Sequence, residues 1–306
     1  MIVITGGCGF IGSNLVKRLN ATGKKKILIV DKLNKIKKKN IKNLKFIKIE
    51  NKDIFLNKLI KGKYDKKIEY IYHYGACSDT TNTDWDYLYK NNYLYSKKLI
   101  NYSVKNKIKI VYASSASVYG LSANNKKENY SNLKPINYYA KSKYLIDKYV
   151  KKINSKYIIG LRFFNVYGNN ELHKKNMMSP ITKFYLDIKK TQKCKIFDEY
   201  AGYKKGEHAR DFIFVEDCND IAQWLIKNNK YGIFNVGTGK VTTFKKVAEI
   251  IIKKIGKGKI EYINFPKKLK KKYQCYTKAN INKLIANGYK KNFTSIKKSL
   301  NRIYSW

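Results

Sequence analysis

A tyrosine and a lysine four residues apart could together remove a proton from a hydroxyl group. Tyr139 and Lys143 have this spacing within residues 138–152, a segment with helical periodicity, so their side chains would share one helix face. A free phenol has a pKa of about 10 and becomes a base near neutrality only when a nearby positive charge favours the phenolate. The ammonium of Lys143 would supply that charge, so the pair predicts general acid–base chemistry on an alcohol.

The spacing alone is weak evidence, because the chain contains 27 tyrosines and is rich in lysine. Tyr138 and Lys141 are neighbours that could produce similar patterns by chance. The position of the pair is more informative, since it follows an apolar strand-like run at 108–113 and a serine-rich run at 114–117. A serine at that strand end could hydrogen-bond the substrate oxygen beside the tyrosine.

The N-terminal glycines form a second candidate site. Gly6, Gly9 and Gly12 stand in the pattern Gly-x-x-Gly-x-x-Gly between a strand-like run and a helical segment. The first would allow a tight turn, the second would let the backbone approach a pyrophosphate, and the third would let the helix pack close to the sheet. A second strand-like run ends at Asp31, about twenty residues downstream, where an acid can bind an adenosine ribose. This context predicts a dinucleotide site.

The choice between NAD and NADP depends on the charges that follow this second strand. Asp31 favours NAD because a carboxylate repels a 2′-phosphate, whereas Lys32 and Lys38 could bind that phosphate. In a chain this rich in lysine, both lysines could equally be solvated surface residues. We favour NADP, with NAD as the less favoured alternative.

Alternating strand and helix patterns must position these residues. Strand-like runs occupy 2–5, 27–31, 46–49, 68–74, 108–113 and 157–163, and helical segments occupy 12–20, 87–105 and 138–152. This alternation predicts an α/β fold of Rossmann type, with a doubly wound parallel sheet.

Beyond residue 168 the pattern changes and predicts a smaller, mainly C-terminal substrate-binding lobe. Residues 169–210 are polar and irregular apart from a helical stretch near 181–190. We expect residues 211–220 and 233–237 to return to the main sheet, 243–255 to form a helix, and the tail from 260 to rejoin the small lobe. We therefore assign 1–168 plus 211–259 to the dinucleotide-binding domain and 169–210 plus 260–306 to the lobe.

Composition narrows the class of protein. The 306 residues show no apolar run of membrane-spanning length and no export leader, which predicts a cytoplasmic protein without membrane insertion. Five scattered cysteines with no C-x-x-C pair predict neither disulfides nor a metal site. The net charge of +45 would suit nucleic-acid binding, but the lysines are spread over every segment. That spread indicates AT-rich coding bias and no specific nucleic-acid partner.

Further motifs occur in order along the whole chain. They include Gly75-Ala76-Cys77-Ser78, Ser114-Ser115-Ala116-Ser117-Val118-Tyr119-Gly120, Phe164-Asn165-Val166-Tyr167-Gly168, Glu171-Leu172-His173-Lys174, Arg210-Asp211-Phe212 and Phe265-Pro266. With the glycine pattern and Tyr-x-x-x-Lys, this set resembles the extended short-chain dehydrogenase/reductase superfamily. Within it, the chain is similar to the ADP-L-glycero-D-manno-heptose 6-epimerase family.

The resemblance implies roles for individual residues. It makes Tyr139 one acid/base and Lys174 a second, with Lys143 supporting the tyrosine and Ser115 orienting the substrate. The implied cofactor contacts are Gly6, Gly9, Phe10, Ile11, Gly12, Asp31, Lys32, Lys38, Lys52, Tyr74, Gly75, Ala76, Cys77, Ser78, Asn91, Lys143, Val166 and Lys174. The implied substrate contacts are Asn165, Asn176, Lys183, Phe197, Arg210 and Tyr273.

The implied reaction is epimerisation of ADP-D-glycero-D-manno-heptose at C6″ through a transient 6″-ketone with bound NADP, which supplies heptose for the lipopolysaccharide core. The resemblance also implies a homo-oligomer, with a pentamer as one form. Departures from the family pattern affect mainly the substrate contacts: Asn176 replaces a serine, Lys183 a histidine and Tyr74 an acidic residue, and extra residues lie near 200–206. Lys175 is an adjacent alternative to Lys174 as the second base.

Two other functions stay open. A UDP-hexose 4-epimerase or dTDP-hexose 4,6-dehydratase is the nearest alternative, although Ser115-Ala116-Ser117 lacks the acidic pair typical of dehydratases. A non-catalytic nucleotide- or RNA-binding protein is the second, and the intact Tyr139, Lys143 and Ser115 disfavour it.

Overall fold

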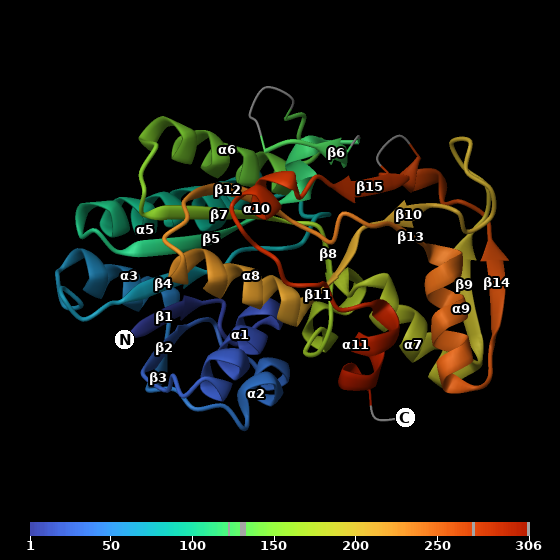
Figure 1. Cartoon of the computed structure of the whole chain (residues 1–306), viewed down its shortest axis with the longest axis horizontal. Helices are drawn as coiled ribbons and strands as arrows, with labels where there is room; N and C mark the ends of the chain where they lie inside the picture. The colour runs from blue at the N-terminus through green and yellow to red at the C-terminus, as the bar shows by residue number, and fades with distance from the viewer. Residues whose placement is uncertain (122, 129–132, 271–272, 305–306) are drawn as a thin grey trace.

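The computed structural model describes residues 1–121, 123–128, 133–270 and 273–304. Its main element is a seven-stranded sheet with the order β12-β7-β5-β4-β1-β2-β3, in which every adjacent pair is parallel (Figure 1). The strands are β1 Ile2–Thr5, β2 Ile27–Val30, β3 Lys48–Glu50, β4 Tyr70–His73, β5 Lys109–Ser115, β7 Ile158–Phe163 and β12 Gly232–Val236. The strand order reverses between β1 and β4, which confirms the predicted doubly wound α/β fold.

Both faces of this sheet are buried because its strands are apolar on both sides. In β1, Ile2 and Ile4 belong to one core cluster and Val3 belongs to the other, as the alternation of side chains along a strand requires. The first face is covered by α1 Phe10–Ala21 and α8 Val215–Lys227, and the second by α3 Lys52–Ile60, α5 Tyr95–Lys105 and α6 Tyr138–Ile153.

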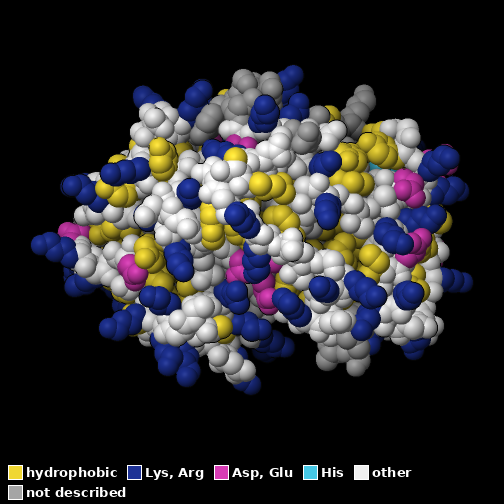
Figure 2. Space-filling view, in the orientation of Figure 1, with side chains coloured by type: hydrophobic (Ala, Val, Ile, Leu, Met, Phe, Trp, Pro, Cys, Tyr) yellow, Lys and Arg dark blue, Asp and Glu magenta, His cyan; other side chains and the backbone are white. Residues whose placement is uncertain are grey.

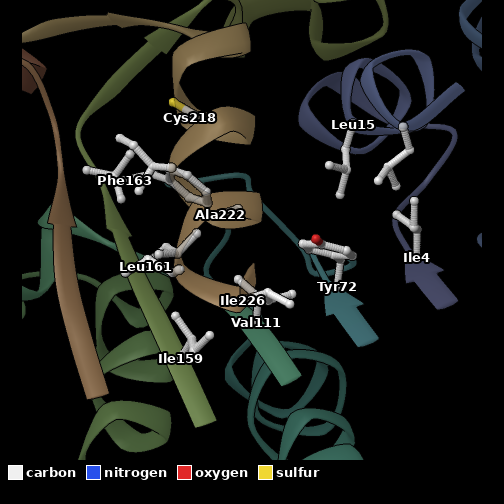
Figure 3. Packing of buried hydrophobic residues seen from close by; sticks show 14 of the residues in the cluster. Ile4, Leu15, Tyr72, Val111, Ile159, Leu161, Phe163, Cys218, Ala222 and Ile226 are labelled. Atoms are coloured by element: carbon white, nitrogen blue, oxygen red, sulfur yellow. The ribbon is translucent and has the colours of Figure 1, made fainter. Parts of the chain in front are cut away.

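Figure 3 shows the packing on the first face, where side chains of two helices meet those of the strands. Leu15 projects from α1, and Ala222 and Ile226 project from α8, toward sheet residues that include Ile4 and Val111. All five side chains are almost completely buried. This packing fixes the start of α1 at the carboxyl end of β1, where the glycine pattern lies.

The smaller lobe has its own apolar core. Strand β9 Lys193–Phe197 pairs in parallel with β14 Lys259–Ile263, and the core around them includes side chains of α7 Pro180–Thr191, α9 Phe244–Ile255 and α11 Ile296–Ile303. These elements lie together on the right of Figure 1. Short strands connect the lobes: β8 Asn165–Tyr167 pairs with β11 Phe212–Phe214, and β13 Thr242–Thr243, β10 Ala209–Arg210, β15 Tyr276–Ala279 and β6 Ala123–Lys126 form a four-stranded sheet.

Several expected segments pack differently from our prediction. The expectation that residues 211–220 return to the main sheet is wrong for their strand, because β11 pairs with β8 and α8 then begins at Val215. The predicted helix at 243–255 is confirmed as α9, but it packs against α7 and β9. Conversely, α10 Asn282–Ala286 packs on β12 of the main sheet. The division of the chain at the expected boundaries therefore stays an interpretation.

The expected helix at 87–105 contains a π-helical segment. Helix α4 Trp85–Leu88 continues into η1 Tyr89–Leu94 and then into α5. Asn92 lies inside η1 and is buried. Such π-helical turns are frequent at functional sites, because they redirect one side chain out of the regular helical phase.

Among the described residues, no helix combines the length and apolar character needed to cross a bilayer. On the face seen in Figure 2, Lys and Arg side chains are dispersed and acidic side chains are few. This distribution matches the even spread of lysine along the sequence.

Candidate active site

A cavity of about 330 Å³ lies at the carboxyl ends of β1, β4, β5 and β7. In a doubly wound sheet, this crevice is where ligands bind. Four side chains predicted for catalysis line it together: Ser115 from β5, Tyr139 and Lys143 from α6, and Lys174 from the short segment η3 Leu172–Met177.

Tyr139 lies in the first turn of α6, which begins after Asn137. The Asn137 side chain accepts a hydrogen bond from Ala140 N and so fixes this start. Burial raises the pKa of Tyr139 above its ordinary value, and a hydrogen bond with Ser115 opposes the rise. Ser115 Oγ also accepts a hydrogen bond from Ser117 Oγ at 2.9 Å. The phenol is therefore already connected to the serine that could orient a substrate oxygen.

Lys143 lies beside the ring of Tyr139. Its Nζ donates to Ala113 O at 2.8 Å and lies 5.9 Å from the centroid of the Tyr139 ring. Burial lowers the pKa of Lys143 to about 8, and the charge of Asp147, one helical turn further along α6, opposes this effect. Lys143 thus keeps its ammonium close to the phenol while remaining able to lose its proton near neutral pH.

Lys174 reaches the same cavity from η3. Its Nζ lies 5.3 Å from the centroid of the Phe10 ring, and burial lowers its pKa while the charge of Glu171 raises it. The adjacent Lys175 is exposed and has a positive φ of 49°. Of the two neighbouring lysines, only Lys174 therefore lines the cavity.

Glu171 holds the segment that carries Lys174. Its carboxylate is 1% exposed and accepts hydrogen bonds from Gly168 N at 2.9 Å and from the Oγ atoms of Ser179 and Thr182 at 2.8 Å each. Ser179 N donates to the second carboxylate oxygen. These bonds tie both ends of the 168–179 segment to one buried group.

The glycine turn between β1 and α1 forms an anion cradle. Gly6 has a φ of 70°, and a Cβ at this position would lie 2.7 Å from Gly75 N. A Cβ at Gly12 would lie 2.2 Å from Gly6 O, so only glycine allows the helix to approach the turn. Gly9 precedes α1, whose first N–H groups receive no side-chain cap from the described chain. Such free N–H groups suit a phosphate.

Unpaired polar atoms in the cavity also fit a large polar ligand. Tyr74 Oη and Ser114 Oγ are buried and find no hydrogen-bond partner among the described residues, and both side chains line the cavity. Buried polar groups are normally paired, so these two indicate where a ligand would complete the site. Ile11, Ala76, Ser78 and Val166 line the same cavity, as predicted. The cradle and the cavity together fit a dinucleotide.

Asp31 has a different cation beside it from the two that the sequence suggests. Its carboxylate accepts hydrogen bonds from Lys37 Nζ and Lys32 N at 2.7 Å each and from Cys8 N at 2.9 Å. The side chains of Lys32 and Lys38 are exposed. Lys37 escaped sequence reasoning because lysine is frequent throughout α2 Lys35–Ile41, a helix whose start is capped by the Asn34 side chain.

The strand end after β4 is held by Asn92, a residue that sequence reasoning passed over. Asn92 Oδ1 accepts from Cys77 N at 2.8 Å and its Nδ2 donates to Cys77 O at 3.0 Å. The predicted neighbour Asn91 donates to Tyr87 O within its own helical segment. Lys52 also lies away from the cavity lining, where its Nζ donates to Asp53 at 2.7 Å. The π-helical turn explains why Asn92 is the one directed at the sheet.

A second cavity of about 390 Å³ adjoins the first and shares Asn165 and Pro180 with it. Arg210 is buried there, 4.9 Å from the Tyr273 ring centroid and 5.4 Å from that of Phe244. Phe197 and Lys183 also line it. Burial lowers the pKa of both Arg210 and Lys183.

These groups could hold a nucleotide diphosphate between a cation and aromatic rings. Asn176 is exposed, and it contributes a carbonyl that accepts from Lys183 Nζ at 2.5 Å. The predicted substrate contacts therefore come together around one cavity, with Asn176 at its edge acting through the backbone.

Known proteins resemble this chain in both sequence and structure. Residues 2–237 match the NAD dependent epimerase/dehydratase family. The chain is 43% identical over 305 residues to an ADP-L-glycero-D-manno-heptose-6-epimerase of Brachyspira hyodysenteriae, covering 97% of this chain and 94% of the relative.

Two solved structures have the same TM-score of 0.84 to this chain. The ADP-L-glycero-D-manno-heptose-6-epimerase of Helicobacter pylori is 28% identical, with 99% of this chain and 94% of that chain covered. A UDP-N-acetylglucosamine 4-epimerase from Methanobrevibacter ruminantium, in complex with UDP-N-acetylmuramic acid, is 27% identical, with 99% and 96% covered.

Proposed function

The chain belongs to the NAD dependent epimerase/dehydratase family, and on that basis we propose that it converts ADP-D-glycero-D-manno-heptose into ADP-L-glycero-D-manno-heptose by inverting C6″. One observation carries the proposal: Tyr139 and Lys174 reach one cavity from different elements, beside a dinucleotide cradle. Inversion through a ketone requires a proton to leave and return at two orientations of the sugar. Two separate proton-transfer groups meet that requirement.

Each group in the cavity has a separate role in the proposed reaction. A bound nicotinamide dinucleotide supplies the site that accepts hydride from C6″ and returns it. Ser115 orients the hydroxyl oxygen, and one of Tyr139 and Lys174 takes its proton. The 6″-ketone turns within the cavity, and the other group donates a proton to its oxygen. Lys143 supports the Tyr139 phenolate through its charge and would bind the ribose of the cofactor.

We propose NADP as the preferred cofactor, with NAD less favoured. The carboxylate of Asp31 is 6% exposed and already paired with Lys37 at 2.7 Å. A neutralised carboxylate repels a 2′-phosphate less than a free one. The exposed Lys32 and Lys38 could add a second positive charge next to that phosphate.

We place the ADP moiety in the second cavity. Arg210 would pair with the diphosphate, with Lys183 as a further cation, and Phe197 and Tyr273 would contact the nucleotide. The biosynthetic role in supplying lipopolysaccharide heptose and the homo-oligomeric state are part of the same proposal. Light scattering after size exclusion would measure the oligomer directly.

Product stereochemistry tests the reaction. The protein is incubated separately with ADP-D-glycero-D-manno-heptose and with UDP-galactose, and the products are read by NMR. We expect inversion of the heptose alone. Inversion of UDP-galactose in its place would support a 4-epimerase and overturn the proposed substrate.

Two variants test the proton-transfer groups. Tyr139→Phe and Lys174→Met should each lower turnover about 100-fold or more, because each removes a positioned acid or base. Affinity for the dinucleotide should change little. Lys175→Met is the matched control and should keep its turnover, because Lys175 is exposed outside the cavity. Near-normal turnover in Tyr139→Phe or Lys174→Met would remove that residue from the mechanism.

A further inference from the structure

His173 lies against the glycine turn, directly before Lys174 in η3. A Cβ built on Gly9 would lie 3.9 Å from His173 Nε2. This ring nitrogen therefore faces the α-carbon that a dinucleotide diphosphate would approach most closely. The side chain is half-buried, so it is held in place while one edge stays accessible.

Asn40 of α2 determines which ring nitrogen carries the proton. Asn40 Nδ2 lies 3.0 Å from Cys8 O and 3.3 Å from His173 Nδ1. Because a carbonyl oxygen can only accept a hydrogen bond, the Asn40 atom next to Cys8 O must be the amide nitrogen. An amide nitrogen can only donate a hydrogen bond. Nδ1 must therefore accept, so the neutral imidazole carries its proton on Nε2, the nitrogen that faces Gly9.

The charges around the ring favour this neutral form. Burial lowers the pKa of His173, and the charges of Lys37 and Lys174 lower it further. A hydrogen bond between the ring and the backbone of Asn170 raises the pKa of His173, as does the charge of Asp31, but both effects are smaller than that of burial. The ring thus presents an N–H donor to the turn at neutral pH.

We propose that His173 donates a hydrogen bond from Nε2 to the diphosphate of the nicotinamide dinucleotide, with Asn40 as the residue that positions its ring. This inference rests on the proposed function, because it assumes that a dinucleotide occupies the cradle. Its consequence is a direct link between the cofactor and the segment carrying Lys174. The diphosphate would hold η3 against the turn and so keep the second proton-transfer group at the cavity.

Pairs of ligands that differ in the diphosphate test this contact. NADPH and NADH contain the diphosphate bridge, whereas adenosine 2′-monophosphate and adenosine contain neither of its two phosphates. Affinities are measured by calorimetry for the wild-type protein and for His173→Phe, which keeps a ring but has no donor. Losing a hydrogen bond to a charged group removes enough binding free energy that NADPH and NADH should bind about tenfold more weakly to the variant. The affinities for adenosine 2′-monophosphate and adenosine should stay within about twofold, since the lost donor faces only the diphosphate.

Further variants separate a direct contact from a structural role. His173→Gln restores an N–H donor and should recover part of the loss. Asn40→Leu and His173→Phe are also combined in a double variant. If Asn40 acts through His173, this double variant should bind NADPH no more weakly than whichever single variant binds it more weakly.

The outcomes distinguish this inference from the proposed function. Equal loss of affinity for NADPH and adenosine 2′-monophosphate in His173→Phe, or wild-type affinity for both, would overturn the diphosphate contact while leaving the proposed function intact. Failure of the wild-type protein to bind either NADPH or NADH would overturn the proposed function, and the contact with it.

Discussion

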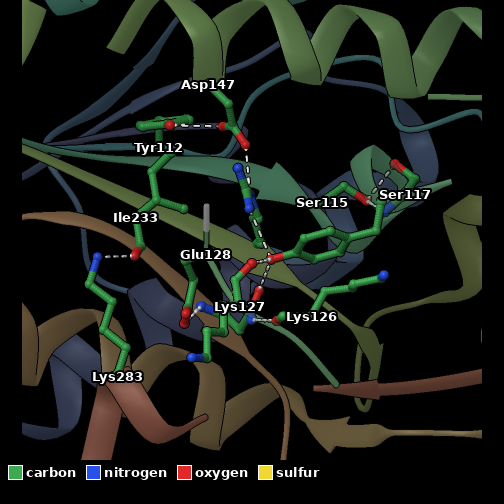
Figure 4. Close-up of polar contacts among 12 residues, drawn as sticks. Tyr112, Ser115, Ser117, Lys126, Lys127, Glu128, Asp147, Ile233 and Lys283 are labelled. Atoms are coloured by element: carbon green, nitrogen blue, oxygen red, sulfur yellow. Dashed lines mark hydrogen bonds and ion pairs between the residues drawn. The ribbon is translucent and has the colours of Figure 1, made fainter. Parts of the chain in front are cut away.

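Replacing Asp147 by Asn would leave a buried cation without its counter-ion. Arg162 Nε lies 2.8 Å from Asp147 Oδ2, and both side chains are 0% exposed. Tyr112 Oη donates to the other carboxylate oxygen at 2.8 Å, as Figure 4 shows. Removing one partner of such a pair costs about 3–5 kcal/mol, because the remaining charge stays desolvated. An amide keeps one acceptor, so we expect the free energy of unfolding to fall by about 3 kcal/mol.

The same change should alter the protonation of Lys143. Asp147 follows Lys143 by one helical turn, and its charge raises the pKa of that lysine against the burial that lowers it to about 8. Without the charge, the pKa of Lys143 falls further, so the ammonium is lost at lower pH. Because the ammonium supports the Tyr139 phenolate, the alkaline limb of the turnover profile should shift to lower pH.

Urea unfolding and the dependence of kcat on pH measure the two effects. Asp220→Asn is the matched control: Asp220 is 11% exposed and pairs with Arg18 at 2.8 Å and with Lys291, whose side chains are 44% and 49% exposed. For Asp220→Asn we expect the free energy of unfolding to fall by about 1 kcal/mol or less, and the pH dependence of kcat not to shift. Asp147→Glu retains the charge and should keep the alkaline limb in place. If Asp147→Asn resembled Asp220→Asn in both measurements, the reasoning from burial would be refuted.

Two other variants test buried groups near the site. Glu171→Gln directs an amide N–H₂ at the backbone and hydroxyl donors that now bond the carboxylate, so unfolding free energy should fall by about 1–3 kcal/mol and turnover should decrease. Unchanged urea unfolding would contradict this. Burial lowers the pKa of His73, held between Thr5 and Ser96 hydroxyls, to about 3. The unfolded chain takes up this proton at about pH 6.5, so stability should fall with decreasing pH by up to about 1.4 kcal/mol per unit in that interval. His73→Gln should flatten that slope in urea unfolding at pH 7, 6 and 5, and an equal slope in both proteins would exclude His73 as its source.

The central strands of the main sheet could be predicted because their sequences are locally apolar, whereas the edge strand β3 is Lys-Ile-Glu. Residues 2–4 are Ile, Val and Ile, and the neighbouring strand β2 is Ile-Leu-Ile-Val. The short strands of the second lobe carry no such signal. In β10, Ala209 and Arg210 pair with Thr243 and Thr242 on one side and with Tyr276 and Thr277 on the other. These pairings depend on residues far apart in the chain, so no local pattern predicts them.

Among site residues, the predictable ones are those that a strand end or a helix face positions. Tyr139 and Lys143 lie one turn apart on α6, and the spacing of four residues is itself the geometric information. Asn92 and His173 required more than spacing. The first projects from a π-helical turn and the second from a short 3₁₀ segment with a kink at Lys175, so neither follows the regular periodicity of an α-helix. Their directions became known only from the structure.

Net charge says little about this site, because its electrostatics depend on where a few acids lie. The chain has 66 Lys and Arg residues but only 21 acids. Yet Asp147 raises the pKa of Lys143, and Glu171 does the same for Lys174. Neither acid lines the cavity that both lysines line. Each carboxylate thus helps a lysine of the cavity to keep its proton while lying outside the cavity lining itself. The positive charge therefore remains directed at the proposed phenolate, ketone and dinucleotide.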